Sequence, residues 1–175
     1  MNRINLLTFT CLFVMLFSCK EAKKPETPLK VITSTYYFIR HAEKDRTDPT
    51  DKNPHLTEIG NARANHWSEI LGEIKFDAVY STDYNRTKET AQPTATKNNL
   101  EITLYDPKQI DAQAFLKENE GKTVLIVGHS NTTPAFVNKI LGSNKYEDID
   151  DSNNGNLYIV TITGEQINDQ VLTIN

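Results

Sequence analysis

Cysteine is almost missing from this sequence. The chain has 175 residues and two cysteines, Cys11 and Cys19, and both lie near its N-terminus. If a leader that contains Cys11 is removed, Cys19 is the one cysteine left, and a single cysteine cannot form an internal disulfide. A disulfide framework is therefore excluded for the mature protein. Apolar residues make up 38% of the chain, which is long enough to bury one hydrophobic core as a single domain.

An excess of basic residues is also missing. The chain has 19 lysines and arginines against 23 aspartates and glutamates, which gives a formal net charge of −4. Nucleic acid is not expected as a partner, because binding a phosphate backbone requires a basic surface. A small basic pocket is compatible with this average, since the net charge says nothing about local arrangement.

No apolar run is long enough to cross a membrane as an ordinary helix, which needs about 20 residues. Residues 6–17 form a shorter apolar stretch whose length is typical of the hydrophobic region of a secretory signal. The sequence Leu-Phe-Ser-Cys at residues 16–19 resembles the bacterial lipobox, in which cleavage before the cysteine leaves a thiol to be lipidated. A plain secretory signal and an uncleaved signal anchor are the alternatives.

These features predict three parts of the chain. Residues 1–18 are expected to be a lipoprotein signal peptide, residues 19–33 a lipidated Cys19 followed by a flexible tether, and residues 34–175 the folded domain. Two prolines in the tether disfavour a helix there. The predicted location is the bacterial cell envelope. Lipid on Cys19 would anchor the protein to the outer membrane. It would face either the periplasm or the cell exterior.

Residues 36–44, Tyr-Tyr-Phe-Ile-Arg-His-Ala-Glu-Lys, organise the rest of the chain. An aromatic and β-branched run that ends in Arg40 and His41 predicts a buried strand with a cation and an imidazole at its carboxyl end. Open α/β sheets bind their ligands at that edge. Arginine at this place suggests an anion such as phosphate. Histidine can serve there as nucleophile, base or metal ligand.

The same alternation of apolar strands and amphipathic helices continues along the chain. Further strands are expected at residues 76–80, 102–105, 123–127, 157–163 and 170–174, and helices at 57–71, 84–97, 111–120 and 132–141. Pro93 should kink or end its helix early. The continuous apolar run at 123–127 predicts a central strand buried on both faces. Together the elements predict an α/β sheet covered by helices on both faces.

Groups able to carry positive charge follow three of these strands. They are Arg40 with His41, Arg86 in the helix after Ser81, and His129. If the strands are parallel, these groups meet at one edge of the sheet and repel one another unless an anion lies among them. Phosphoryl transfer accounts for the set, because a neutral imidazole can attack phosphorus while the other groups stabilise charge on its oxygens. The simpler alternative for Arg86 alone is a solvated surface residue.

Four motifs in this order resemble the histidine phosphatase superfamily, whose fold is that of phosphoglycerate mutase. The motifs are Arg40-His41-Ala42-Glu43, Leu56-Thr57-Glu58-Ile59-Gly60, Tyr80-Ser81 with Arg86-Thr87 and Thr90-Ala91, and Val127-Gly128-His129-Ser130. The resemblance covers residues 35–175. It implies an α/β three-layer sandwich with a mostly parallel central sheet and helices on both faces.

The resemblance also implies a function and the residues that perform it. The protein would be a metal-independent phosphatase without a cofactor, acting on phosphomonoesters or phosphohistidine in a small molecule or a phosphoprotein. His41 would be the phosphorylated nucleophile. The phosphate pocket would be completed by Arg40, Arg86, His129 and Ser130.

The proton donor is the point where this sequence departs from the family. Family phosphatases usually carry an acid on an insert after the third strand, and this chain has little room for an insert there. Residues 106–111 resemble the family's stretch that leads to this acid, and the resemblance implies Asp111 as the proton donor. Glu43 is a second candidate. The alternative for Asp111 is that it caps the helix that it precedes, a role for which aspartate is well suited.

Three rival functions stay open at this stage. A metal site built from His41, His55, His66 and His129 is disfavoured, because no pair has the HxH or HxxxH spacing. A catalytically weak or silent lipoprotein that binds phosphorylated ligands is a second alternative. A phosphotransferase of the phosphoglycerate mutase type is a third, although the predicted signal peptide argues against an intracellular substrate.

Overall fold

The chain alternates strands and helices in the predicted order. The computed structural model describes residues 31–174. Within that range there are six strands and four helices. The elements are β1 (Thr33–Arg40), α1 (Glu58–Ile70), β2 (Ala78–Ser81), α2 (Asn85–Lys97), β3 (Ile102–Leu104), α3 (Ala112–Glu118), β4 (Thr123–Gly128), α4 (Thr132–Leu141), β5 (Asn156–Thr163) and β6 (Gln166–Thr173). The predicted leader and Cys19 lie outside the described residues.

The strands form one mixed sheet with the order β3-β2-β4-β1-β5-β6. The neighbours β3, β2, β4 and β1 run parallel, whereas β5 pairs antiparallel with both β1 and β6. β4 lies between β2 and β1, and its residues Val124, Leu125 and Val127 are fully buried. The predictions of a mostly parallel sheet and of a central strand at this position are therefore confirmed.

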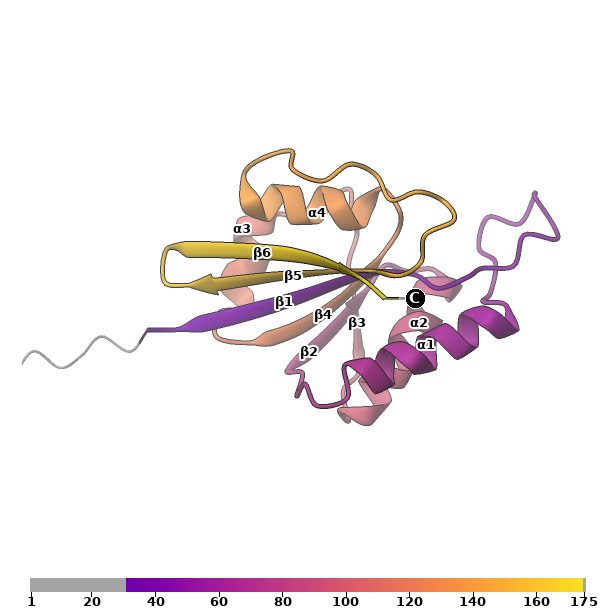
Figure 1. Cartoon of the computed structure of the whole chain (residues 1–175), viewed down its shortest axis with the longest axis horizontal. Helices are drawn as coiled ribbons and strands as arrows, with labels where there is room; N and C mark the ends of the chain where they lie inside the picture. The colour runs from indigo at the N-terminus through magenta and orange to yellow at the C-terminus, as the bar shows by residue number, and fades with distance from the viewer. Residues whose placement is uncertain (1–30, 175) are drawn as a thin grey trace, which may run out of the picture. The chain divides into compact units, whose positions relative to one another are not determined.

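Helices cover the sheet on both faces, and α1 and α2 lie opposite α3 and α4 (Figure 1). The alternation of side chains along β1 explains the two layers. Phe38 points to the α3–α4 side, where its ring meets Phe136 of α4 at a centroid distance of 5.4 Å. Ile39 points to the other side and packs in the cluster that contains Trp67 of α1. Two apolar cores, one on each face, thus hold the predicted three layers together.

Two local predictions differ in part from the structure. The helix predicted at 84–97 is present as α2, and Pro93 does not end it early, because α2 continues to Lys97. A proline inside a helix removes one backbone hydrogen bond, but Thr94 and Ala95 beyond it are buried in the fold, and their burial holds the last turn in place. The spacing of Ala62, Trp67, Ile70 and Leu71 predicts one apolar face for the helix at 57–71. Trp67 and Leu71 are buried as predicted, whereas Ala62 and Ile70 are exposed and Ala64 is buried.

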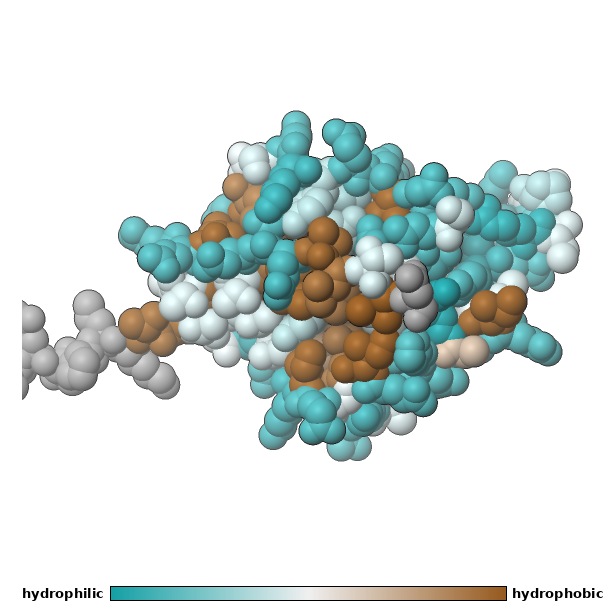
Figure 2. Space-filling view, viewed as in Figure 1, coloured by the Kyte–Doolittle hydropathy of each residue, from teal (hydrophilic) through white to brown (hydrophobic). Residues whose placement is uncertain are grey.

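β6 forms one edge of the sheet, and its side chains are largely exposed. Ile167, Val171 and Leu172 are among the exposed apolar residues. Figure 2 shows apolar side chains gathered in the middle of this face, within a surface that is otherwise mainly hydrophilic. No helix in residues 31–174 is long and apolar enough to span a bilayer.

Helix α1 supports the segment that follows β1. Thr57 caps the helix by accepting a hydrogen bond from the backbone of Gly60 at 3.0 Å, and its own N–H donates to the Glu43 carbonyl at 2.9 Å. Thr57 is therefore the N-cap of α1, a position for which threonine is suited. A Cβ atom at Gly60 would lie 2.1 Å from that same Glu43 oxygen, so only glycine permits this approach.

We expect Gly60→Ala to destabilise the fold although alanine is the better helix former. The added methyl group must displace the backbone at Glu43, and overpacking of this kind typically costs about 1–3 kcal/mol. Urea unfolding measures the loss. Asn65→Ala, an exposed change in the same helix, is the matched control and should be neutral or slightly stabilising. Equal stability of the two variants would contradict the close approach.

Candidate active site

The histidines that follow β1 and β4 lie side by side at the carboxyl edge of the sheet. The two strands are parallel, and Arg40 pairs with Gly128 at their ends. The backbone N–H of His41 continues this pairing by donating to the Gly128 carbonyl at 2.9 Å. As a result the rings of His41 and His129 have centroids 5.5 Å apart and planes inclined at 68°. Two elements that are distant in sequence thus bring both imidazoles to one place.

The His41 ring has a defined tautomer. Its Nδ1 lies 2.8 Å from the carbonyl oxygen of Ala42. A carbonyl can only accept, so Nδ1 carries the proton and Nε2 retains its lone pair. The side chain is buried, and burial lowers the pKa of His41 to about 3, with the charges of Arg40 and Arg86 adding to the effect. The imidazole is therefore neutral at neutral pH and has a nucleophilic nitrogen.

His129 has the opposite tautomer, because of a chain of hydroxyl groups. Its Nε2 lies 2.9 Å from Oγ1 of Thr82, and Thr82 donates its own proton to Oγ1 of Thr87 at 3.0 Å. The Thr82 oxygen must therefore accept from Nε2–H of His129, which leaves the lone pair on Nδ1. Burial and the nearby charge of Arg86 together lower the pKa of His129 to about 4. Both rings are neutral near pH 7.

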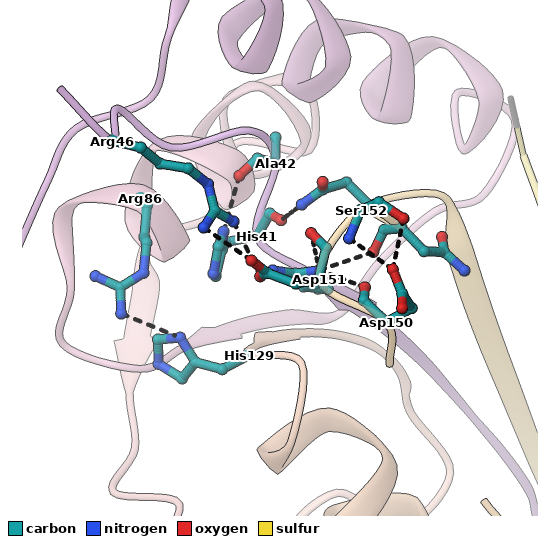
Figure 3. Close-up of polar contacts among 11 residues, drawn as sticks. His41, Ala42, Arg46, Arg86, His129, Asp150, Asp151 and Ser152 are labelled. Atoms are coloured by element: carbon teal, nitrogen blue, oxygen red, sulfur yellow. Dashed lines mark hydrogen bonds and ion pairs between the residues drawn. The ribbon is translucent and has the colours of Figure 1, made fainter. Parts of the chain in front are cut away.

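Arg86 lies in the first turn of α2 and points to the histidine pair (Figure 3). Arg86 is only 9% exposed, so the alternative that it is a solvated surface arginine is wrong. Nη2 lies 3.5 Å from Nδ1 of His129, and the Tyr84 ring lies 4.5 Å from the guanidinium carbon. The Nε and Nη1 atoms are buried and have no hydrogen-bond partner within residues 31–174. Two donors of a buried cation are therefore available to an anion.

Arg40 is also buried, at 2% exposure, but its contacts differ from those expected. Nη1 donates to the carbonyl oxygens of Asp150, Asp151 and Asn153 at 2.9–3.1 Å. Nη2 donates to the Asp151 carboxylate at 2.7 Å. In residues 31–174 the Nε atom has no partner. The terminal nitrogens of Arg40 therefore hold the segment between α4 and β5 against the site, and Nε is a buried donor that a phosphate could use.

The two candidate acids have other partners. Asp111 caps α3, as its alternative role predicts, since its carboxylate accepts from the backbone of Gln113 and Ala114 at 2.9 and 3.2 Å. No hydrogen bond in the described chain joins it to the histidine pair. Glu43 accepts from Nε of Arg63 at 2.7 Å through Oε1, while its Oε2 is buried without a partner in the described range. A proton-donor role for either residue stays a prediction.

Ser130 also stays a prediction as a phosphate ligand. The backbone carbonyl of Ser130 accepts a hydrogen bond from the N–H of Ile149 at 2.8 Å. This bond ties the start of α4 to the segment that Arg40 holds. Two of the histidines considered for the rival metal site have carboxylate partners, since His55 pairs with Glu89 and His66 with Glu69. Residues 31–174 contain no group of three or more metal-ligating side chains placed to hold a metal ion.

Sequence reasoning missed several residues around the histidine pair. Thr90 accepts from the N–H of Ala42 at 2.9 Å and so fixes the backbone beside the nucleophile. Asn154 donates to the carbonyl of His41 at 2.8 Å. Asp151 binds Arg40 across a separation of 111 residues. No local pattern marks these contacts, although Thr90 lay inside a motif that resembled the family.

The fold and the site define an α/β protein of phosphoglycerate-mutase-like architecture with paired histidines at the carboxyl edge of its sheet. Within it, residues 36–107 match the histidine phosphatase superfamily (branch 1). No curated protein matches the chain in sequence.

Solved structures with this fold include several phosphatases. A phosphoserine phosphatase mutant from Entamoeba histolytica has 16% identity and a TM-score of 0.62, over 78% of this chain and 95% of its own. A protein assigned as the phosphohistidine phosphatase SixA from Agrobacterium tumefaciens has 18% identity and a TM-score of 0.59, over 80% and 98%. A mycobacterial glucosyl-3-phosphoglycerate phosphatase has 14% identity and a TM-score of 0.59, over 81% and 98%. At these identities the likeness shows the shared fold.

The lowered pKa of His41 predicts a pH dependence of stability. Histidine in the unfolded chain has its ordinary pKa of about 6.5, whereas folded His41 stays neutral down to about pH 3. The unfolded state binds more protons between these values, so stability falls as the pH falls through that window. From about pH 6.5 to about pH 4.5, the wild type should lose about 2–3 kcal/mol more than His41→Gln.

Urea unfolding at a series of pH values measures this difference. His66→Gln, a change at an exposed position on α1, controls for the substitution itself. If the stability curves of wild type and His41→Gln run parallel over this range, His41 is not held neutral by the fold.

Proposed function

We propose that this chain is a member of the histidine phosphatase superfamily and hydrolyses phosphomonoesters or phosphohistidine through a phosphohistidine intermediate on His41. The observation that carries the proposal is the neutral, buried His41, whose free Nε2 lies beside His129 and the unused donors of Arg86. The match of residues 36–107 to the superfamily supports it. The phosphatases among the structures of like fold support it further.

The geometry supports a two-step reaction. In the first step Nε2 of His41 attacks phosphorus, and the bond from phosphorus to the leaving oxygen or nitrogen breaks with its electron pair on the leaving group. In the second step water attacks the phosphorus of phospho-His41 and gives a proton to solvent. The bond from phosphorus to Nε2 breaks with its electron pair on Nε2, which releases phosphate and returns His41 to its neutral form. Nε and Nη1 of Arg86 would stabilise the charge on the equatorial oxygens, since they are donors fixed in place before the reaction.

His129 would join the phosphate pocket in a charged form. The phosphoryl dianion raises the pKa of a nearby imidazole. Once protonated, Nδ1 would no longer accept from Nη2 of Arg86 and would instead donate to the phosphate, while Nε2–H remains on Thr82. The proposed reaction uses only these side chains and needs no metal ion.

A catalytically weak protein that binds phosphorylated ligands is the second candidate. The observation that favours it is the engagement of Arg40, whose Nη1 and Nη2 are directed to the segment between α4 and β5. An arginine committed in this way contributes less to the transition state than one whose planar fork faces the phosphate. The activity assay below separates the two candidates.

We also propose that the protein is a lipoprotein of the bacterial cell envelope, cleaved after residue 18 and anchored by lipid on Cys19. The support is the sequence pattern of residues 1–19. In that setting the substrate would be a small phosphorylated molecule or a phosphoprotein outside the cytoplasm.

We expect His41→Ala to abolish hydrolysis of p-nitrophenyl phosphate and of phosphohistidine without unfolding the protein, because it removes the nucleophile. EDTA should leave the wild-type rate unchanged. His66→Ala is the control, since this histidine lies on the exposed face of α1. Steady-state rates and a circular dichroism melt test both points. A wild-type rate in His41→Ala would overturn the mechanism, and no turnover by the wild type would leave the binding function.

Asp111→Asn isolates the predicted acid from the cap that the structure shows. Asparagine is a good N-cap, so α3 keeps its cap, while the proton is lost. If Asp111 donates that proton, hydrolysis of an alkyl phosphate should fall by about 10²–10⁴, because an alkoxide leaves poorly without a proton. Hydrolysis of nitrophenyl phosphate should change little. A similar effect on both substrates would exclude Asp111, and Glu43→Gln is then the next variant to assay.

A further inference from the structure

One carboxylate in the described chain lies between a buried and an exposed arginine beside the histidine pair (Figure 3). Asp151 receives Nη2 of Arg40 at 2.7 Å. It also receives both terminal nitrogens of Arg46, with Nη1 on Oδ2 at 2.8 Å and Nη2 on Oδ1 at 2.9 Å. This bidentate arrangement is the one in which a guanidinium recognises a carboxylate most specifically. The Asp151 side chain is 69% exposed, so solvent and solutes reach it.

The segment that carries Asp151 does not depend on that carboxylate for its position. Nη1 of Arg40 already binds three backbone carbonyls of the segment. Asn154 donates to the His41 carbonyl, and the N–H of Ile149 donates to the carbonyl of Ser130. Because these bonds anchor the segment on both sides of residue 151, the carboxylate can leave Arg46 while the backbone stays in place.

Lys44 adds a further positive charge two residues before Arg46. It is half-buried and has no carboxylate within ion-pair distance in residues 31–174. Burial lowers the pKa of Lys44, and the nearby charges of Arg86 and Arg46 lower it further. A lysine crowded by arginines gains from an added anion. Lys44 and Arg46 thus extend the positive charge of the phosphate pocket along one side.

We propose that Lys44 and Arg46 form a subsite for a carboxylate group of the substrate, and that the Asp151 carboxylate occupies this subsite when no substrate is bound. The inference rests on the proposed phosphatase function and narrows its substrate class to phosphomonoesters that carry a carboxylate near the phosphate. Exchange of one carboxylate for another at Arg46 conserves the ion pair. The exchange therefore costs little, because exposed pairs of this kind contribute little to stability.

The matched substrates 3-phosphoglycerate and glycerol 3-phosphate test the proposal, since they differ only in a carboxylate against a hydroxymethyl group. The full-length wild type should have a kcat/KM about tenfold or more higher for 3-phosphoglycerate. Its carboxylate would take over the Arg46 pair from Asp151 and would gain a charge-assisted contact with Lys44, which has no carboxylate partner in residues 31–174. Arg46→Gln should remove most of this ratio through a higher KM for 3-phosphoglycerate. Asp151→Asn should lower that KM, because it removes the competing carboxylate.

Lys145→Gln is the control, because it removes one cation that pairs with Asp169 away from the site. Its substrate ratio should equal that of the wild type. Equal kcat/KM for the two substrates in the wild type, or an unchanged ratio in Arg46→Gln, would overturn the subsite and leave the phosphatase function standing. If neither substrate is hydrolysed, calorimetric binding to the same variants decides.

Tighter binding of 3-phosphoglycerate than of glycerol 3-phosphate by the wild type, with the difference lost in Arg46→Gln, would support the subsite. That result would contradict only the proposed phosphatase activity. Equal binding of the two would overturn the subsite as well. A bisphosphorylated glycerol, measured in the same way, separates a subsite for carboxylates from one for a second phosphate. Preference for the bisphosphate would contradict the carboxylate assignment.

Discussion

The parallel pairing of β1 with β4 is the constraint on which the candidate site depends. Their register ends with Arg40 opposite Gly128, and the next backbone hydrogen bond places His41 against the end of β4. Gly128 is needed at this point, because a Cβ atom there would lie 2.7 Å from Oγ1 of Thr133. A shift of register by one residue would send each side chain of β1 to the opposite face. It would separate the imidazoles and disrupt both apolar cores at once.

The site combines positive side chains with neutral histidines, and burial explains how both exist together. Moving an imidazolium out of water is costly, so a buried histidine stays neutral at pH values where an exposed histidine would be protonated. The arginines keep their charge, because guanidinium is not deprotonated in proteins. A separate hydrogen bond fixes the tautomer of each ring. His41 donates from Nδ1 to the Ala42 carbonyl, and His129 donates from Nε2 to the Thr82 hydroxyl. A nucleophile and a set of anion-binding donors result.

Arg40 shows how a buried charge shapes the surrounding chain. A guanidinium at 2% exposure needs partners for its donors. The backbone between α4 and β5 supplies carbonyl oxygens for Nη1, and Asp151 supplies a carboxylate for Nη2. The same carboxylate reaches Arg46 at the surface. One ionic network therefore connects the end of β1 with a loop more than a hundred residues later, and it joins the core to the exposed rim of the site.

The sequence by itself determined the layers, the strand ends and the four groups that meet there. Apolar runs that stop at Arg40, His41 and His129 are local patterns, and the rule that parallel strands share a carboxyl edge converts them into a site. The cap at Asp111 was likewise readable, because capping involves only neighbouring backbone groups. Other features were decided by the tertiary structure. The continuation of α2 past Pro93 depends on burial against the sheet. The contact of Arg46 with Asp151 joins residues 105 apart, and the path of an irregular loop sets such contacts, which no periodicity or motif encodes.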